Sequence, residues 1–206
     1  MMKLFWAPNS RAMRALWMLE EIGQPYERIL IDIRNGAQDR PDYRAINPLG
    51  KVPAIDDDGV IVAESGAVIA YLGDRYPAAN LAPKIGDRTR GPYLKWLFFT
   101  ACIEGAILEK FKKLDVPKST AGWGSYALVV EALDQALQKG PWLLGDHFTG
   151  ADVVIGSDLW FGCDLFKIIE KRPSFAAYIE RCLARPALQR AMAIDKAASE
   201  AAASKS

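Results

Sequence analysis

Hydrophobic and polar positions follow two different rhythms along this chain. In residues 1–76, short apolar runs alternate with stretches whose apolar residues recur every three or four positions. Short runs are typical of strands, and the longer spacing is typical of amphipathic helices. From about residue 87 onward, almost every segment has helical spacing. The pattern therefore predicts a mixed α/β domain followed by an all-α domain.

The first domain is expected to have the element order β-α-β-α-β-β-α. A buried strand at residues 3–7 leads into a helix that Ser10 opens, and a second strand covers residues 26–31. Two strands joined through a helix favour parallel pairing. A short helix, a hairpin of two strands and a third helix are expected at residues 41–45, 54–56, 60–62 and 65–76. Asp58 and Gly59 supply the positive φ that a tight hairpin turn requires.

Proline and glycine residues punctuate the rest of the chain. Residues 78–86 contain Pro83 and little periodicity, so they are expected to link a first domain at 1–77 to a second domain at 87–206. Because Gly and Pro end helices, the segments between them predict helices at 87–114, 125–139, 151–168, 174–184 and 186–195. The tail from Ala197 receives no assignment.

Thr149 and Asp152 have the spacing of a capping box at the start of an apolar helix. In such a box the threonine caps the helix, and the acidic residue accepts a hydrogen bond from the N–H group of the cap. This role in folding is favoured over a catalytic role for Asp152. His147, the single histidine, is expected to be a loop residue.

Composition excludes several classes of partner. Lys and Arg total 26 against 25 Asp and Glu, so the net charge of +1 provides no field that would hold nucleic acid. The apolar run at the amino terminus is too short for a secretory signal or a membrane span. The chain is therefore expected to be soluble and to bind neither nucleic acid nor membranes.

The cysteines point to a reducing compartment. Cys102, Cys163 and Cys182 are odd in number and widely spaced, and they form no C-x-x-C pair. This spacing argues against a disulfide framework and against a zinc site, so a cytoplasmic location is expected. The acidic residues of the expected helix at 151–168 recur every six positions and scatter around it, so no metal site is expected.

The most informative motif lies at residues 47–53, Asn-Pro-Leu-Gly-Lys-Val-Pro. Proline removes most of the penalty for a cis peptide bond and forces Val52 into an extended conformation. An extended residue at a kink can offer its N–H and C=O groups to the backbone of an incoming peptide, as an added strand. An ordinary loop proline before an edge strand is the alternative for the Val52-Pro53 pair alone.

Taken with Glu64-Ser65 at the start of a helix, this motif resembles the glutathione-binding half of cytosolic glutathione transferases. The expected β-α-β-α-β-β-α order is that of their thioredoxin-like domain. The resemblance implies a thioredoxin-like domain joined to an all-α domain, a cis bond at Pro53, glutathione as co-substrate and a homodimer.

The segment Pro8-Asn9-Ser10-Arg11 resembles the serine-type, bacterial-like branch of that family. The resemblance implies that the Ser10 hydroxyl donates to the glutathione thiolate, with Asn9 as the alternative donor. Tyrosine-type members have a tyrosine where this chain has residues 5–7, and cysteine-type members have a thiol near position 10. Ser10 also fits a simple helix cap, and the two roles can coexist.

By the same resemblance, Val52 and Pro53 hold the peptide backbone of glutathione. Ser65 binds the γ-glutamyl carboxylate and Glu64 the ammonium group, although a helix cap beside a surface acid is the simpler interpretation. Lys51 is the first candidate for the glycine carboxylate. The alternatives for that carboxylate are Gln38 and Arg40.

The expected activity is conjugation of the glutathione thiolate to small hydrophobic electrophiles in detoxification. The alternatives are a glutathione-dependent isomerase or peroxidase, and a binding or regulatory protein of the same fold without activity. A reductase of mixed disulfides is disfavoured because the amino-terminal cysteine is missing. The electrophile pocket is expected between the domains, lined by Ala7, Pro8 and apolar residues of the helix at 87–114: Phe98, Phe99, Cys102, Ile103, Ala106, Ile107 and Phe111.

Overall fold

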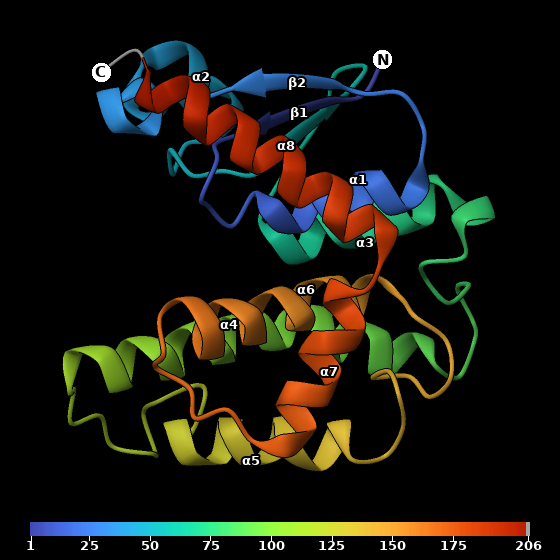
Figure 1. Cartoon of the computed structure of the whole chain (residues 1–206), viewed down its shortest axis with the longest axis vertical. Coiled ribbons are helices and arrows are strands. Elements are labelled where there is room, and N and C mark those ends of the chain that lie inside the picture. The colour runs from blue at the N-terminus through green and yellow to red at the C-terminus, as the bar shows by residue number, and fades with distance from the viewer. Residues whose placement is uncertain (205–206) are drawn as a thin grey trace. The chain divides into compact units, whose positions relative to one another are not determined.

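A computed structural model of the chain describes residues 1–204, which form two compact units (Figure 1). The sheet unit comprises Met1–Ala79 together with the chain from Arg185 onward, and the helical unit comprises Asn80–Ala184. The last helix thus groups with the sheet, whereas the sequence pattern placed it with the other helices.

The sheet unit contains a four-stranded sheet in the order β2-β1-β3-β4. The strands are β1 (Lys3–Trp6), β2 (Glu27–Leu30), β3 (Ala54–Asp57) and β4 (Val60–Ala63). The parallel pairing predicted for the first two strands is confirmed, and β3 is antiparallel to both of its neighbours. Asp58 (φ 49°) and Gly59 (φ 97°) form the predicted two-residue turn, with positive φ at both positions as a type I′ turn requires.

The helices of the sheet unit are α1 (Met13–Ile22), α2 (Pro41–Ile46), α3 (Ser65–Arg75) and α8 (Pro186–Ala203). Short 3₁₀ turns lie at Ile33–Asn35, Ala37–Asp39 and Pro77–Ala79. The predicted order of strands and helices is therefore confirmed. On one face of the sheet, Tyr43 of α2 packs with Phe5, Ile31 and Ala54 in a buried cluster. Strand alternation turns Leu4 and Trp6, which are also buried, to the opposite face.

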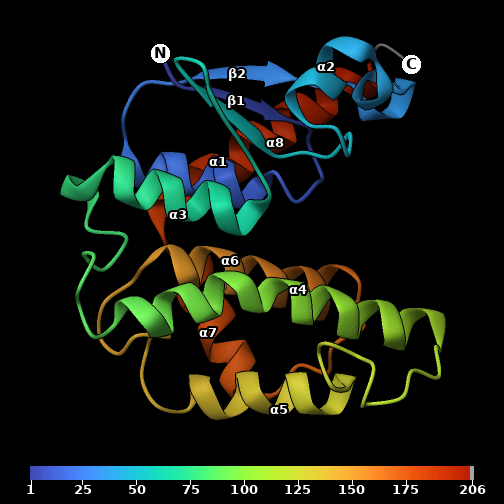
Figure 2. The ribbon, with the colours of Figure 1, turned by 180° about the vertical axis from the view of Figure 1, so that it is seen from behind.

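Helix α1 is enclosed by its neighbours. It packs against both α3 and α8, and α8 crosses it obliquely in the front view of Figure 1 and the rear view of Figure 2. Every residue from Met13 to Leu19 is buried, which explains why this helix has few polar positions. Two predicted bounds are wrong here. Helix α1 begins at Met13 and not at Ser10, and α8 continues to Ala203, through the alanine-rich tail that had no assignment. Alanine has the highest helix propensity of any residue, so this tail can extend the helix.

The helical unit consists of α4 (Arg90–Lys112), α5 (Tyr126–Leu137), α6 (Gly150–Leu159), a π-helical turn (Trp160–Leu165) and α7 (Pro173–Leu183). Helix α6 packs against α4 and α7, and all of its residues are buried. The predicted capping box at Thr149 and Asp152 is confirmed. None of the helices in residues 1–204 is long and apolar enough to cross a membrane.

The single helix predicted at residues 151–168 is interrupted. Its α-helical bonds end at Leu159, and the N–H of Phe166 reaches the carbonyl of Phe161, five residues earlier, at 2.8 Å. Gly162 lies against Ile169, whose Cδ1 would be 2.6 Å from a Cβ at position 162. The absence of a side chain at Gly162 therefore lets the chain fold back on itself, which apolar spacing alone does not reveal.

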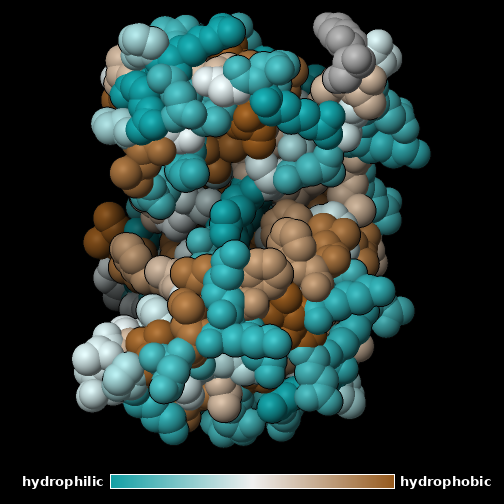
Figure 3. Space-filling model, turned by 90° about the vertical axis from the view of Figure 1, so that its left-hand side faces the viewer, coloured by the Kyte–Doolittle hydropathy of each residue, from teal (hydrophilic) through white to brown (hydrophobic). Residues whose placement is uncertain are grey.

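The helical unit also carries hydrophobic side chains on its surface, and Figure 3 shows apolar patches among the polar residues of the lower half of that view. Phe98 and Phe111 of α4 are 70% and 62% exposed, whereas Ile103 and Ala106 of the same helix are buried. Of the apolar residues expected to line an electrophile pocket, some are therefore exposed to solvent and others are buried in the core.

Candidate functional site

Three of the strands bring the predicted site residues to one end of the sheet. Phe5 of β1 pairs with Ala54 of β3, and Ala54 pairs with Ala63 of β4. Because β3 runs opposite to both neighbours, its start lies beside the ends of β1 and β4. The loop after β1 leads to Ser10, the segment before β3 is Lys51–Pro53, and the residues after β4 are Glu64 and Ser65. All six predicted site residues thus belong to segments that leave the same end of the sheet.

The segment before β3 exposes peptide groups. The Val52–Pro53 bond is cis, Pro53 is buried and Val52 is half-buried. Within residues 1–204, neither the N–H nor the C=O group of Val52 has a hydrogen-bond partner in the protein. These two groups can pair with the backbone of an extended peptide.

Two side-chain hydrogen bonds fix the position of the segment at residues 51–53. The Lys51 carbonyl accepts hydrogen bonds from the Tyr43 hydroxyl at 2.7 Å and from the Asn47 side-chain amide at 2.8 Å. Burial raises the pKa of Tyr43 from 10 to about 12, so its hydroxyl keeps its proton well above the pH at which an exposed tyrosine ionises. The side chain of Lys51 itself is exposed. Tyr43 was not singled out from the sequence, and Asn47 was named only as the first residue of the 47–53 motif. Their bonds to the Lys51 carbonyl depend on the packing of α2 against this segment, which the sequence does not show.

The start of α3 is an uncapped helix terminus. Glu64 occupies the N-cap position with φ 70° and ψ 123°, and no side chain caps the helix. The first intrahelical bond runs from the N–H of Val68 to the carbonyl of Glu64, at 2.9 Å. The N–H groups of Ser65 and of the two residues after it therefore precede the first helical bond. Such groups, together with the helix dipole, favour an anion.

Ser10 lies in a turn before α1 and does not cap that helix, so the predicted helix start at Ser10 is corrected. The N-cap residue is Ala12, two positions further along the chain. The Ser10 hydroxyl donates to the carbonyl of Ala7 at 2.6 Å and accepts from the N–H of Ala12 at 3.1 Å. The hydroxyl therefore closes its own turn, and it must leave Ala7 to donate to a ligand.

Asn9, the residue before Ser10, is held by α8. Its backbone N–H lies 3.2 Å from both carboxylate oxygens of Asp195, and its side-chain amide donates to the Ser199 hydroxyl at 2.9 Å. Asn9 has a left-handed φ of 55°. Burial raises the pKa of Asp195, and the hydrogen bond from Asn9 opposes that rise. Sequence reasoning missed this contact, because 186 residues separate the two partners and no local signal marks either one.

A cavity of about 400 Å³ opens beside the same loop. Residues 7–9 line one side of it, the chain at 30–35 lines another, and Ala198, Ala201 and Ala202 of α8 complete it. The cavity therefore belongs to the sheet unit alone. Its walls are mostly apolar, with the exposed Arg34 and Asp32 at the rim.

Two other residues considered from the sequence, Asp152 and His147, make contacts that stabilise the fold. Asp152 is fully buried and accepts hydrogen bonds from the N–H groups of Leu143 and Thr149, each at 2.9 Å. His147 lies in a loop, where its Nε2 is 2.6 Å from the carbonyl of Asn80. Among the residues that the structure describes, no three His, Cys, Asp or Glu side chains gather to hold a metal ion.

Known proteins resemble this chain in sequence and in fold. Residues 1–74 match the family model described as "Glutathione S-transferase, N-terminal domain". Glutathione S-transferase hmp2 of Hypomyces subiculosus is 32% identical over 165 residues, which cover 73% of this chain and 77% of that protein. The disulfide-bond oxidoreductase YfcG of Escherichia coli strain K12 is 29% identical over 167 residues, covering 74% of this chain and 76% of that protein.

Among solved structures, a sphingomonad glutathione S-transferase complexed with glutathione has a TM-score of 0.78 and 28% identity, over 94% of this chain and 98% of that chain. The predicted combination of a thioredoxin-like domain and a helical region is therefore confirmed. With the relative from Hypomyces above 30% identity over most of its length, this chain belongs to the glutathione S-transferase family.

Proposed function

We propose that this protein is an enzyme that conjugates the glutathione thiolate to small hydrophobic electrophiles. The observation that carries the proposal is the convergence of Ser10, Val52 and Ser65 at one end of the sheet. Each offers a group of the kind that an anionic tripeptide requires. These are a hydroxyl donor, a free pair of backbone groups and an uncapped helix start.

Glutathione binding follows from these groups. The N–H and C=O groups of Val52 pair with the peptide backbone as an added strand, with Pro53 setting the direction of the chain. The γ-glutamyl carboxylate binds at Ser65 and the start of α3, and Glu64 takes the ammonium group. Lys51 reaches the glycine carboxylate, with Gln38 and Arg40 as alternatives. The left-handed φ of Glu64 supports a functional role, because non-glycine residues retain this conformation mainly where the surrounding structure imposes it.

Ser10 acts as a hydrogen-bond donor to the thiolate. When glutathione binds, the hydroxyl turns from the Ala7 carbonyl to the sulfur, while its bond from the Ala12 N–H keeps the oxygen in place. The thiolate then attacks the electrophilic carbon. The S–C bond forms, and the leaving group departs with its electron pair. Ser10 is neither a base nor a covalent nucleophile in this step.

Thiol activation alone is a modest effect. A thiol with a pKa near 8.5 is about 3% ionised at pH 7, and lowering the pKa by two units gives roughly a 25-fold gain in thiolate. The stabilised thiolate is about 8-fold less nucleophilic, which leaves roughly a threefold net benefit. Most of the rate enhancement therefore comes from holding the electrophile beside the sulfur.

The test is the Ser10→Ala variant. We expect the pKa of the bound thiol, followed by the ultraviolet absorbance of the thiolate, to rise and conjugation to slow. Affinity for glutathione should stay nearly unchanged, because Val52 and Ser65 remain. Ser204→Ala is the matched control, since within residues 1–204 that hydroxyl donates to the Ala201 carbonyl near the end of α8 and to no other group. Unaltered turnover in Ser10→Ala would move the donor role to Asn9 or to backbone N–H groups.

A disulfide reductase is the second candidate, because one relative is named a disulfide-bond oxidoreductase. The cysteines of this chain give that candidate little support. All three lie in the helical unit and form no disulfide within residues 1–204, and burial raises the pKa of Cys163 to about 11. An assay with a glutathione mixed disulfide decides between the two activities. Isomerase and peroxidase substrates belong in the same panel, and clear glutathione capture without turnover would favour a binding or regulatory protein.

We further propose a homodimer in the cytoplasm that serves detoxification. The exposed Phe98 and Phe111 of the helical unit support a protein interface, since large exposed apolar side chains often mark one. The three cysteines form no disulfide within the described chain, which supports a reducing compartment. Light scattering after size-exclusion chromatography should give twice the mass of one chain, and a monomer would remove the dimer from the proposal.

A further inference from the structure

We propose that Asp195 of α8 is a positioning residue for the Ser10 hydroxyl, acting through the backbone of Asn9. This inference rests on the proposed function of Ser10 as donor to the glutathione thiolate. It assigns a role in that chemistry to a residue of α8 that lies 186 positions after Asn9 in the chain.

The contact is specific in its geometry. Both oxygens of Asp195 accept from a single N–H group, that of Asn9, at 3.2 Å each. Within residues 1–204 this carboxylate has no other hydrogen-bond or ion-pair partner, although the residue is only 7% exposed. A buried carboxylate without a cation is costly unless it is hydrogen-bonded. Asp195 is therefore poorly explained as a simple contribution to helix packing.

The second contact lies one helical turn further along α8. Ser199 follows Asp195 by four residues, so the two side chains share one face of the helix. Ser199 accepts a hydrogen bond from the Asn9 side chain while Asp195 binds the Asn9 backbone. Helix α8 thus binds both the main chain and the side chain of Asn9.

These contacts act on a residue with an uncommon backbone conformation. Asn9 has φ 55°, in the left-handed region that few non-glycine residues adopt, although asparagine enters it more readily than most. The conformation of Asn9 sets the direction in which the chain enters Ser10. If Asn9 relaxed to negative φ, the turn closed by Ser10 between Ala7 and Ala12 would be displaced.

Helix α8 is itself firmly anchored. Arg185 binds both carboxylate oxygens of Glu21 at 2.5 and 2.7 Å, and Arg190 binds the Glu20 carboxylate at 2.9 Å and its carbonyl at 2.7 Å. These pairs tie the start of α8 to the end of α1. The later turns of α8 then hold the loop before α1. The helix therefore bridges the two ends of α1 and fixes the loop relative to the sheet.

The first experiment compares Asp195→Ala with Asp195→Asn. Alanine removes the acceptor, so we expect the pKa of bound glutathione to rise by at least half a unit and kcat to fall at least fivefold, with little change in glutathione affinity. Asparagine keeps one acceptor oxygen and removes the charge. If Asp195 acts by position, Asp195→Asn should stay close to wild type. If it acts by charge, loss of the negative group should instead lower the thiol pKa, which would overturn the inference.

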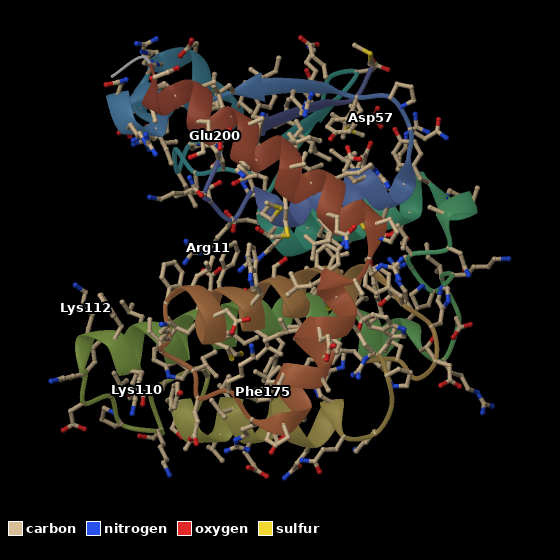
Figure 4. The ribbon with its side chains drawn as sticks, in the orientation of Figure 1. Arg11, Asp57, Lys110, Lys112, Phe175 and Glu200 are labelled. Atoms are coloured by element: carbon tan, nitrogen blue, oxygen red, sulfur yellow. The ribbon has the colours of Figure 1, made fainter. Side chains whose placement is uncertain are left out.

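The matched control is Glu200→Ala, because Glu200 is an exposed acid on the same helix whose carboxylate lies 3.9 Å from Lys196 (Figure 4). We expect this variant to leave thiol ionisation and kcat unchanged. Thermal unfolding of all variants reports on stability separately. A lower melting temperature in Asp195→Ala with wild-type thiol pKa and kcat would assign Asp195 to stability alone and refute positioning.

The double variant Ser10→Ala/Asp195→Ala gives the sharpest result. If Asp195 works only through the Ser10 hydroxyl, its removal should add no further shift in thiol pKa once the hydroxyl is gone. Additive shifts would show that Asp195 reaches the thiol by another route and would overturn the inference. Failure of the proposed function looks different, because wild-type protein would then show no thiolate absorbance with glutathione.

Discussion

The hydroxyl of Tyr178 in α7 donates a 2.8 Å hydrogen bond to the carboxylate of Asp152 in α6. The same carboxylate caps its own helix through the Thr149 N–H and accepts from the Leu143 N–H. Burial raises the pKa of Asp152 while these donors oppose the rise, and burial also raises the pKa of Tyr178. A residue of the capping box thus joins two helices and a loop in the core of the helical unit.

Asp152→Ala should therefore lower stability and leave the chemistry of folded molecules intact. The change removes a helix cap and leaves the Leu143 N–H and the Tyr178 hydroxyl buried without a partner. We expect a loss of about 3 kcal/mol or more in the free energy of unfolding. Urea denaturation measures this loss.

Asp146→Ala is the control for that experiment, because Asp146 is exposed in the loop before the capping box. A surface substitution of this kind should change stability by less than about 0.5 kcal/mol. Normal stability but lost turnover in Asp152→Ala would reverse the assignment and make Asp152 part of the active site.

Local signals in the sequence predicted several features in both units. The Asp58-Gly59 turn, the capping box and the helix start at Ser65 each depend on neighbouring residues, and each is present in the structure. The start of α1 was misplaced because Ser10 satisfies its hydroxyl within a turn, and residue type alone does not distinguish that turn from a helix cap.

The sequence pattern did not predict the contacts between distant segments. The alanine-rich end of α8 has little periodicity, so its extent was not predicted, and neither were the contacts of Asp195 and Ser199 with Asn9. The π-helical turn after Leu159 depends on the packing of Ile169 against Gly162, which lies in a segment with continuous apolar spacing. In each case a tertiary contact decides the local structure.

A second prediction concerns acid stability. Asp57, labelled in Figure 4, accepts hydrogen bonds from Arg75 Nε at 2.7 Å and from the Tyr71 hydroxyl at 2.9 Å. The Arg75 hydrogen bond, helped by Tyr71, lowers the pKa of Asp57 below its ordinary value of 3.8 despite burial. A lowered pKa in the folded state contributes stability above pH 3.8, and this contribution is lost as the pH falls through the folded value.

Asp57→Asn should therefore reduce the melting temperature at pH 7 and flatten its decline between about pH 5 and 3. Calorimetric scans across this range measure both effects. Asp115→Asn is the control, since Asp115 is an exposed loop residue outside the ion pairs of the described chain. Parallel curves for wild type and Asp57→Asn would show that Asp57 contributes nothing to acid sensitivity.

A third prediction concerns the two hydrogen bonds to the Lys51 carbonyl, which precedes Val52 in the chain. Tyr43→Phe combined with Asn47→Ala removes both donors to the Lys51 carbonyl. The peptide segment should then lose its fixed position, and we expect glutathione to bind about fivefold more weakly, as befits the loss of roughly 1 kcal/mol. Titration calorimetry measures the dissociation constant. Tyr26→Phe is the control, because its hydroxyl bonds to Glu20 at 2.8 Å and not to the segment. Unchanged affinity in the double variant would mean that Val52 needs no such support.

The last prediction separates backbone strain from steric conflict at Gly50. This residue has φ 61°, and a Cβ there would lie 2.8 Å from the backbone carbonyl of Gln38. Gly36 has a similar φ of 74°, but a Cβ added there would meet nothing within 4 Å. Gly36→Ala should therefore cost only the conformational penalty of about 1 kcal/mol, whereas Gly50→Ala should cost clearly more. Because Gly50 directly precedes Lys51, its substitution should also weaken glutathione binding, which the Gly36 variant should leave intact. Equal losses of stability with equal affinities would show that the Gln38 backbone yields to the added methyl group and that Gly50 serves the turn alone.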